Sequence, residues 1–169
     1  MARLVKERGK DFRIRGSNLG DILARCMLLV VTDAMGDTDA TSTVEALLQL
    51  GACPNIPCPW TGISPLVIAL FHSIHYISGR VVELLLEHGA NPGGTPGYVA
   101  KEMRTPLLTA IQSGSAKFVD LLLQHGASPN AKAGDLTPLG LAVDMATGDS
   151  KVSSEVSFRG YISTRCIEG

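Results

Sequence analysis

Hydrophobic and polar residues alternate in blocks along the chain, and three of these blocks share one pattern. Each covers nine residues, from Val44 to Ala52, from Val82 to Ala90 and from Val119 to Ala127. In each block an acidic residue follows the opening valine, three aliphatic residues come next, and a glycine stands second to last. The glycines recur at intervals of 38 and 37 residues. A regular spacing of this length is typical of a repeat protein.

A second motif recurs in phase with the first. It consists of a serine or threonine, a proline and a leucine, with an alanine four residues after the proline. A hydroxyl side chain can cap the N-terminus of a helix, and proline fits the first helical position because its missing N–H would have no partner there. The motif therefore predicts a helix start at three places: Ser64-Pro65-Leu66, Thr105-Pro106-Leu107 and Thr137-Pro138-Leu139.

The two motifs together predict a pair of antiparallel helices. The first helix would begin after Thr105, and Ser115 could cap a second helix that ends at Gly126, where a left-handed residue stops it. Apolar residues at helical spacing give the second helix a broad hydrophobic face. Because one helix pair cannot bury both of its apolar faces, neighbouring pairs must stack. We predict burial between repeats for three residues: Leu85, Ala110 and Leu122.

These residues resemble the ankyrin repeat family, whose unit of about 33 residues carries a Thr-Pro-Leu-His-x-Ala signature. The best match runs from Thr105 to Ala127. The preceding copy has Ser64 in place of the threonine and four extra residues around 73–80. The resemblance implies an all-α fold, an ankyrin-type helix-pair solenoid of three to four repeats. No copy keeps the signature histidine, and the residues at the corresponding positions are Val67, Leu108 and Gly140. The hydrogen bonds that this histidine normally forms are therefore in question.

Two fainter copies extend the array toward the N-terminus. A shift of 38 residues places Cys26-Met27-Leu28 on Ser64-Pro65-Leu66, so a degenerate first repeat is expected from Leu28 to Leu50. Residues 4–12 resemble the end of a still earlier second helix.

The last twenty residues differ from the array in composition. Residues 150–169 contain no leucine and many serines and β-branched residues, which favours extended or disordered chain over helix. The fourth repeat is therefore expected to be incomplete. The expected parts are an N-terminal extension at 1–21, an array at 22–148 with repeats at about 22–57, 58–99, 100–132 and 133–148, and a poorly ordered tail at 149–169.

Composition restricts the classes of function. The chain has 169 residues, of which 45% are hydrophobic, and a formal net charge of −1. Near-neutral charge argues against nucleic acid as a partner, since that binding rests on phosphate neutralisation by Lys and Arg. The dispersed basic residues at 3–15 are interpreted as a solvated end of the chain rather than a nucleic-acid or import patch.

The hydrophobic runs and the cysteines bear on where the protein works. The longest apolar runs, at 27–31 and 65–71, are far too short to cross a bilayer, so no membrane association is expected. The four cysteines lack the density of a disulfide-stapled secreted domain. An intracellular protein, cytoplasmic or nuclear, is therefore expected.

Two cysteines and two histidines form a candidate metal set. Cys53, Cys58, His72 and His75 follow each other in an order superficially similar to a zinc finger, but the histidine spacing is too short for that class. Their repeat positions, in a loop, at a helix end and in an inserted turn, already explain them. No serine, histidine or acid stands in a recognisable nucleophile context, and the glycine-rich loop at 93–97 lacks the lysine of a phosphate loop. We expect no catalytic residue, metal, cofactor or small-molecule substrate, and no enzymatic activity.

The resemblance also implies a function. Ankyrin arrays bind partner proteins through their loop tips and the first helix of each repeat, which line a concave face, so this chain is expected to be a protein-protein interaction scaffold. The alternative is that the array is the substrate-recognition part of a larger enzyme or ubiquitin-ligase complex. Carried over residue by residue, the implied partner-binding residues are Trp60, Thr61, Ile63, Phe71, His72, Lys101, Glu102, Arg104, Gln112, Ser113, Asp144 and Met145.

Trp60 is the only tryptophan of the chain and lies in a proline-rich loop between Pro57 and Gly62. A stiff loop would present the ring with little entropy left to lose, and aromatic anchors often dominate interface energies. The ring could instead fold over the neighbouring loop as packing. The sequence leaves these two alternatives open.

Overall fold

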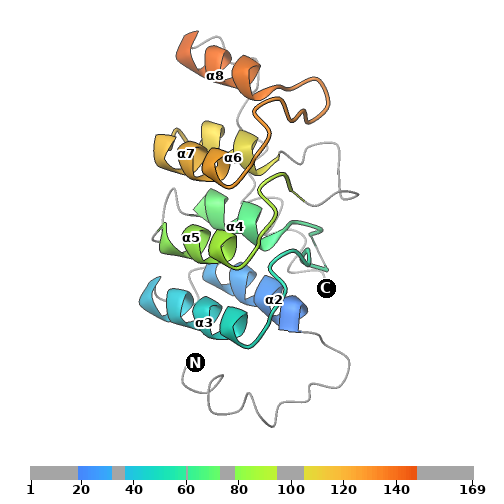
Figure 1. The fold of residues 1–169 in the computed structure, drawn as a ribbon, viewed down its shortest axis with the longest axis vertical. Helices are drawn as coiled ribbons and strands as arrows, with labels where there is room; N and C mark the ends of the chain where they lie inside the picture. Colours follow the sequence, from blue (N-terminus) through green and yellow to red (C-terminus); the bar gives the residue numbers. More distant parts are fainter. Residues whose placement is uncertain (1–18, 32–36, 60, 73–78, 95–104, 148–169) are drawn as a thin grey trace.

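The chain forms a stack of short helices (Figure 1). The computed structural model describes residues 19–31, 37–59, 61–72, 79–94 and 105–147. Within these ranges the regular elements are α-helices, apart from one isolated bridge between Ala133 and Leu136. The helices are α2 (Leu19–Val31), α3 (Asp37–Gln49), α4 (Pro65–His72), α5 (Arg80–Glu87), α6 (Pro106–Gln112), α7 (Ala116–Gln124) and α8 (Pro138–Thr147).

The helices pair in chain order and the pairs stack. Helices α2 and α3 form the first repeat, α4 and α5 the second, α6 and α7 the third, and α8 belongs to a fourth (Figure 1). The first helices α2, α4, α6 and α8 pack on each other in succession, and α3 packs on α5. This arrangement confirms the expected all-α helix-pair solenoid.

Hydroxyl caps begin three of the first helices, as the sequence motif predicts. The side-chain oxygens of Ser64, Thr105 and Thr137 accept the N–H of the third helical residue, at 3.4, 3.3 and 3.1 Å. Each cap satisfies one backbone donor that the helix itself cannot pair. The prediction for Ser115 is wrong in one respect. This residue does precede α7, but its side chain makes no capping hydrogen bond.

The second helices end in one repeated turn. Gly51, Gly89 and Gly126 have φ of 88°, 85° and 89°, a left-handed conformation that glycine adopts without steric strain. Each glycine N–H bonds the carbonyl three residues back at 2.9 to 3.0 Å. The N–H of the following alanine bonds the carbonyl five residues back, also at 2.9 to 3.0 Å. These two hydrogen bonds close the helix and turn the chain toward the next repeat.

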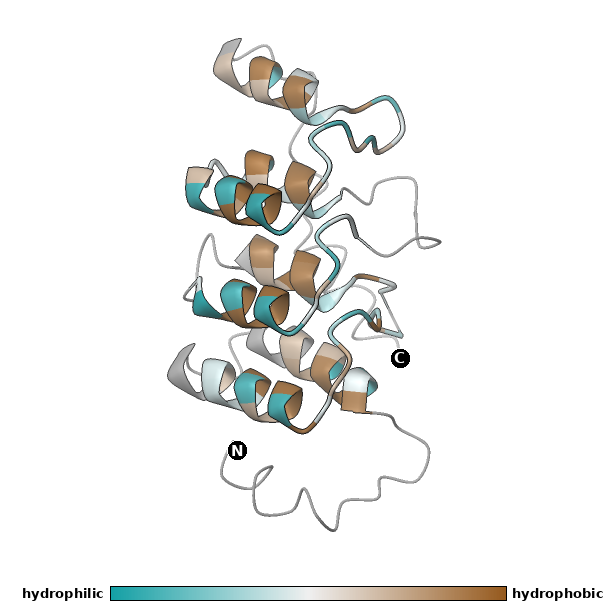
Figure 2. Ribbon diagram, in the orientation of Figure 1, coloured by the Kyte–Doolittle hydropathy of each residue, from teal (hydrophilic) through white to brown (hydrophobic). Residues whose placement is uncertain are grey.

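A continuous hydrophobic core runs through the stack. The hydrophobic sides of first and second helices face each other, and the hydrophilic residues of α5 and α7 lie outside (Figure 2). Leu85, Ala110 and Leu122 are fully buried, which confirms the prediction for these three residues. Leu108, which stands where the ankyrin signature has histidine, is also fully buried. Because the leucine side chain has no polar group, this buried position needs no hydrogen-bond partner.

The first repeat departs from the expectation. Helix α2 begins at Leu19, so Cys26 and Met27 lie inside a helix and not at its start. Both α2 and α3 have 13 residues, whereas α4 and α5 have eight. The shift of 38 residues assumed a first helix of constant length and therefore placed its start too late. The predictions for residues 1–18 and for the tail at 149–169 lie outside the described residues.

Candidate partner-binding surface

Five of the implied partner-binding residues lie at the C-terminal ends of successive first helices. Phe71, Gln112 and Asp144 each stand six residues after the proline that begins α4, α6 or α8. Ser113 and Met145 follow Gln112 and Asp144 directly. Because α4, α6 and α8 pack side by side, these residues form one row along the stack. We call Phe71, Gln112, Ser113, Asp144 and Met145 the first-helix strip.

The strip stays largely outside the hydrophobic core. Phe71, Gln112, Ser113 and Asp144 are half-buried, and Met145 is exposed. Ser113 also has a structural role, because its hydroxyl donates to the carbonyl of Ala110 at 2.6 Å and accepts the N–H of Ser115 at 3.3 Å. These two hydrogen bonds fix the turn between α6 and α7. The strip thus sits on the C-terminal parts of first helices and, at Ser113, on the residue that directly follows α6.

Thr61 and Ile63 do not belong to the surface. Both side chains are buried, which corrects their assignment as partner-binding residues. The loop folds onto the core: the N–H of Cys58 bonds the carbonyl of Ile63 at 2.9 Å, and the N–H of Gly62 bonds the carbonyl of Cys58 at 2.7 Å. Residues that the loop buries cannot touch a partner while the loop stays closed. The remaining candidates, Trp60, Lys101, Glu102, Arg104 and the side chain of His72, lie outside the described residues.

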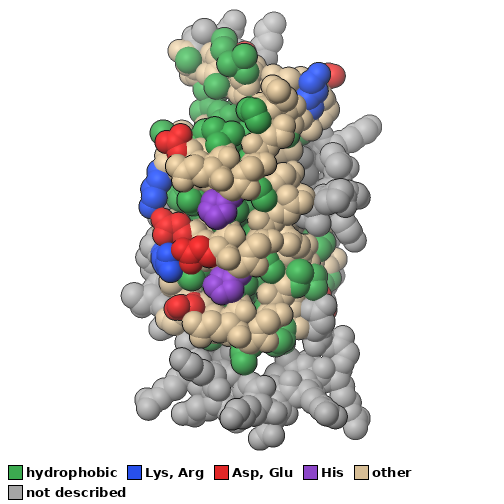
Figure 3. Space-filling model, in the orientation of Figure 1, with side chains coloured by type: hydrophobic (Ala, Val, Ile, Leu, Met, Phe, Trp, Pro, Cys, Tyr) green, Lys and Arg blue, Asp and Glu red, His purple; other side chains and the backbone are tan. Residues whose placement is uncertain are grey.

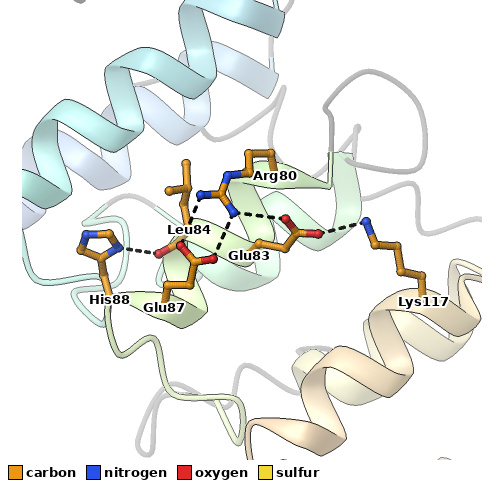
Figure 4. A network of polar contacts seen from close by, with 6 residues as sticks. All are labelled: Arg80, Glu83, Leu84, Glu87, His88 and Lys117. Carbon is orange, nitrogen blue, oxygen red and sulfur yellow. Dashed lines mark hydrogen bonds and ion pairs between the residues drawn. The ribbon is translucent and has the colours of Figure 1, made fainter.

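A charged network covers the opposite, outer side of the stack on α5 and α7 (Figure 4). Arg80 bonds Glu83 at 3.3 Å and Glu87 at 3.0 Å, and Lys117 of α7 bonds Glu83 at 3.0 Å. The hydrogen bond from Lys117 is the main reason that the pKa of Glu83 is lowered, with a further contribution from Arg80. The hydrogen bonds to Glu87 and Glu83 raise the pKa of Arg80.

This network makes Glu83 an inter-repeat contact rather than part of a merely solvated ridge. The histidines of this face fit structural roles, because His88 and His125 occupy the C-cap positions of α5 and α7. Figure 3 shows histidine side chains on this face, beside the acidic and basic ones. The Nδ1 atom of His88 lies 2.8 Å from the carbonyl oxygen of Leu84, within hydrogen-bonding distance. The outer side is thus held together by its own contacts.

A comparison with protein families decides the identity of the fold. A family profile described as ankyrin repeats (3 copies) matches residues 32–133 and again residues 78–150. The chain belongs to the ankyrin repeat family. Ankyrin repeats are generally protein-protein interaction modules, and proteins built from them are typically non-catalytic scaffolds. A comparison with curated proteins gives no match.

One asparagine connects two ankyrin repeats directly, and sequence reasoning missed it. The side-chain amide of Asn55 donates to the carbonyl of Gly89 at 2.9 Å, and its oxygen accepts the N–H of Asn91 at 2.7 Å. Asn55 thereby satisfies two backbone groups of the next loop. The signal was present in the sequence, because Asn55 and Asn130 are both the fourth residue after a helix-ending glycine. Gly93 holds this place in the second repeat and has no side chain to form the bridge.

The described cysteines of this ankyrin array, Cys26, Cys53 and Cys58, belong to no group of described side chains that could hold a metal ion. Cys58 is buried in the core and Cys53 is exposed, while His75 and the His72 side chain lie outside the described residues. Burial raises the pKa of the Cys26 thiol, which keeps it in its protonated, unreactive form. Within the part of the chain that the structure describes, no three His, Cys, Asp or Glu side chains come close enough together to hold a metal ion. No helix there is long and apolar enough to cross a membrane.

Proposed function

We propose that this ankyrin array is a non-catalytic scaffold that holds a partner protein against the first-helix strip. The observation that carries the proposal is the register of Phe71, Gln112 and Asp144, which brings equivalent positions of three repeats into one row on the C-terminal parts of first helices. A row of this kind can contact one segment of a partner at several points. Preorganised side chains lose little conformational entropy on binding, which favours affinity.

The chemistry of the strip fits a protein segment. It combines an aromatic ring at Phe71, an amide at Gln112, a carboxylate at Asp144 and an exposed thioether at Met145. Aromatic and methionine side chains are enriched at protein interfaces, and the polar groups supply the hydrogen bonds that set orientation. Trp60, His72, Lys101, Glu102 and Arg104 are proposed as further contacts on the grounds of their sequence positions alone.

The proposal extends to the kind of partner and to the compartment. The net charge of the chain is near zero and provides no general electrostatic attraction for nucleic acid. We therefore propose a protein as the partner rather than nucleic acid, membrane or a small molecule. The cysteines of the described residues are free thiols. We therefore propose an intracellular site of action, where thiols stay reduced.

A pair of matched charge substitutions tests the surface. Gln112→Lys places a cation in the strip, whereas Gln124→Lys places the same cation on the outer side, at the end of α7. After a partner has been isolated with the full chain, its affinity for each variant is measured by calorimetry. Gln112→Lys should weaken binding at least about tenfold, which corresponds to roughly 1.4 kcal/mol, and Gln124→Lys should change it less than twofold. Equal effects of the two substitutions would reject the strip as the binding surface. If the partner proves to be an enzyme or ligase subunit, the array serves as its substrate-recognition part.

A further inference from the structure

The asparagine bridge ties the first two repeats together on the side of their loops, but the next pair of repeats lacks it. Asn55 bonds the carbonyl of Gly89 and the N–H of Asn91. The equivalent residue one repeat later is Gly93, which has no side chain. Among the described residues no hydrogen bond joins the loop of Gly93 to the next loop, at 126–130. We call the contact between the first and second repeats the first junction, and that between the second and third repeats the second junction.

The second helices differ between the two junctions in the same sense. Helix α3 packs on α5, whereas α5 and α7 are in much less extensive contact. The first helices show no such difference, because α4 packs on α6 as α2 packs on α4. The layer of first helices is therefore continuous through both junctions. The layer of second helices is looser at the second junction than at the first.

Two contacts do join α5 to α7, and both lie near the N-terminal ends of these helices. The Nζ atom of Lys117 bonds Glu83 at 3.0 Å (Figure 4). The ring of Phe118 comes so close to Gly79, the N-cap residue of α5, that a Cβ atom on this glycine would lie 3.1 Å from the ring atom Cε1. These contacts are on the side of the turns within each repeat, away from the loops where the bridge is missing.

This distribution of contacts determines where the stack opens most easily. In a repeat array each repeat contacts only its neighbours, so the stability is roughly a sum of repeat and interface contributions. Regions with few contacts open at lower free energies than well-packed ones. At the second junction the first helices and the N-terminal ends of α5 and α7 stay in contact. The ends of α5 and α7 that point toward the loops are the parts that can separate.

We propose that the second junction is a hinge. It divides the described stack into one arm of α2, α3, α4 and α5 and another of α6, α7 and α8, which turn about the contact between α4 and α6. Each arm has its own internal packing and moves as a unit. The motion changes the shape of the first-helix strip, because Phe71 lies on one arm and Gln112 and Asp144 lie on the other. The inference does not rest on the proposed function, and its test uses no partner.

Dipolar EPR between two nitroxide labels compares the junctions directly. Gln49, Glu87 and Gln124 are exposed and hold the same repeat position at the ends of α3, α5 and α7. Labels are attached in pairs through p-acetylphenylalanine in the full chain, which leaves the native cysteines unmodified. Helices in packing contact lie about 8 to 10 Å apart, so dipolar broadening should be strong for the pair at 49 and 87 and about half as strong or less for the pair at 87 and 124. The second pair should also show a wide spread of distances. Equal broadening for both pairs, or one narrow distance for the second pair, would overturn the hinge.

A substitution that supplies the missing bridge should close the hinge. The backbone of Gly93 is not left-handed, and a Cβ atom there would lie 3.3 Å from Oδ1 of Asn91, the end of a flexible side chain. Gly93→Asn therefore fits, and the groups equivalent to those that Asn55 bonds are the carbonyl of Gly126 and the N–H of Ser128.

In Gly93→Asn the broadening for labels at 87 and 124 should rise toward that for labels at 49 and 87, and the spread of distances should narrow. Gly93→Ala adds the Cβ atom without the amide and should leave the spectra of the unmodified chain unchanged. If asparagine and alanine have the same effect, or if neither has any, the missing bridge does not make this junction a hinge and the proposal is wrong.

Discussion

Helices α5 and α7 have closely similar sequences and different surroundings. Leu86 of α5 and Leu123 of α7 occupy the same repeat position, yet their exposed fractions are 4% and 40%. Five residues of α5 are buried, but only two of α7. Helix α5 has α3 on one side and is joined to α7 on the other by the ion pair between Glu83 and Lys117. On the far side of α7 no described helix follows. At the position of Leu86 and Leu123 the neighbouring repeat therefore decides whether the leucine is buried, and the sequence of its own helix does not.

Substitution of the leucine that both helices bury at one repeat position should destabilise the fold to a similar extent in α5 and α7. This is the largest expected effect. Leu85→Ala and Leu122→Ala each remove a fully buried side chain at the same repeat position. Each should lower the free energy of unfolding by about 2 to 5 kcal/mol, through lost hydrophobic transfer energy and the cavity left behind. Urea or thermal unfolding of the full chain measures the loss. An unchanged midpoint for Leu122→Ala would show that the repeat register is wrong.

The bridge between the first and second repeats gives the next largest effect. Asn55→Ala removes two hydrogen bonds, of 2.9 and 2.7 Å, that have no equivalent at Gly93 between the second and third repeats. With about 0.5 to 1.5 kcal/mol for each bond, the loss should be roughly 1 to 3 kcal/mol in urea unfolding. Gln49→Ala at an exposed position is the control and should stay within about 0.5 kcal/mol. A loss no larger than that of the control would mean that the bridge does not couple the repeats.

Helix α3 offers a substitution that should stabilise the stack. The hydroxyl of Thr43 is buried and has no hydrogen-bond partner, and α5 has Val81 at the equivalent position. Thr43→Val removes an unsatisfied polar group at nearly constant volume and should raise the free energy of unfolding by about 1 kcal/mol. Thr109→Val is the matched control, because the Thr109 hydroxyl donates to the carbonyl of Thr105 at 3.2 Å. The control should give no gain. A gain for both variants would show that valine stabilises for some other reason.

The ion pair that joins α5 to α7 should have the smallest effect. Glu83 and Lys117 are both partly exposed, and exposed pairs contribute less than about 1 kcal/mol. The pKa of Glu83 lies below its ordinary value of 4.5, so its stabilising contribution is complete above that pH and is lost as the pH falls through the native pKa. Unfolding in urea should therefore show that the free energy of unfolding falls less between pH 7 and pH 3 for Lys117→Met than for the unmodified chain. Lys132→Met, at an exposed site, should leave this decrease unchanged. A smaller decrease for Lys132→Met too would argue against a specific pair.

The parts of the fold that the sequence predicts are those that each repeat specifies locally. A hydroxyl cap at Thr105 and a left-handed glycine at Gly126 act within a few residues, so their motifs identify helix starts and ends directly. The start of α2 at Leu19 escaped prediction because the first repeat has longer helices and no proline to mark the beginning.

The contacts that the sequence does not reveal are those between repeats. Asn55 reaches 34 and 36 residues along the chain, and Glu83 meets Lys117 across one repeat length. The periodicity of the sequence aligns equivalent positions of different repeats. It does not predict which residues at different repeat positions are in contact. Thr61 and Ile63 illustrate the same limit for the candidate surface, because their position before a helix suggested a loop tip, whereas the loop folds them into the core.

Photo-crosslinking tests the partner surface most directly. Phe71, Gln112 and Met145 are replaced one at a time by benzoylphenylalanine in the full chain, with Gln49 and Gln124 on the outer side as matched positions. After irradiation with the partner, the strip positions should give crosslinks to one and the same protein, and the outer positions should give at most a small fraction of that yield. Crosslinks of equal yield from Gln49 or Gln124, or none from the strip, would contradict binding through the ends of the first helices.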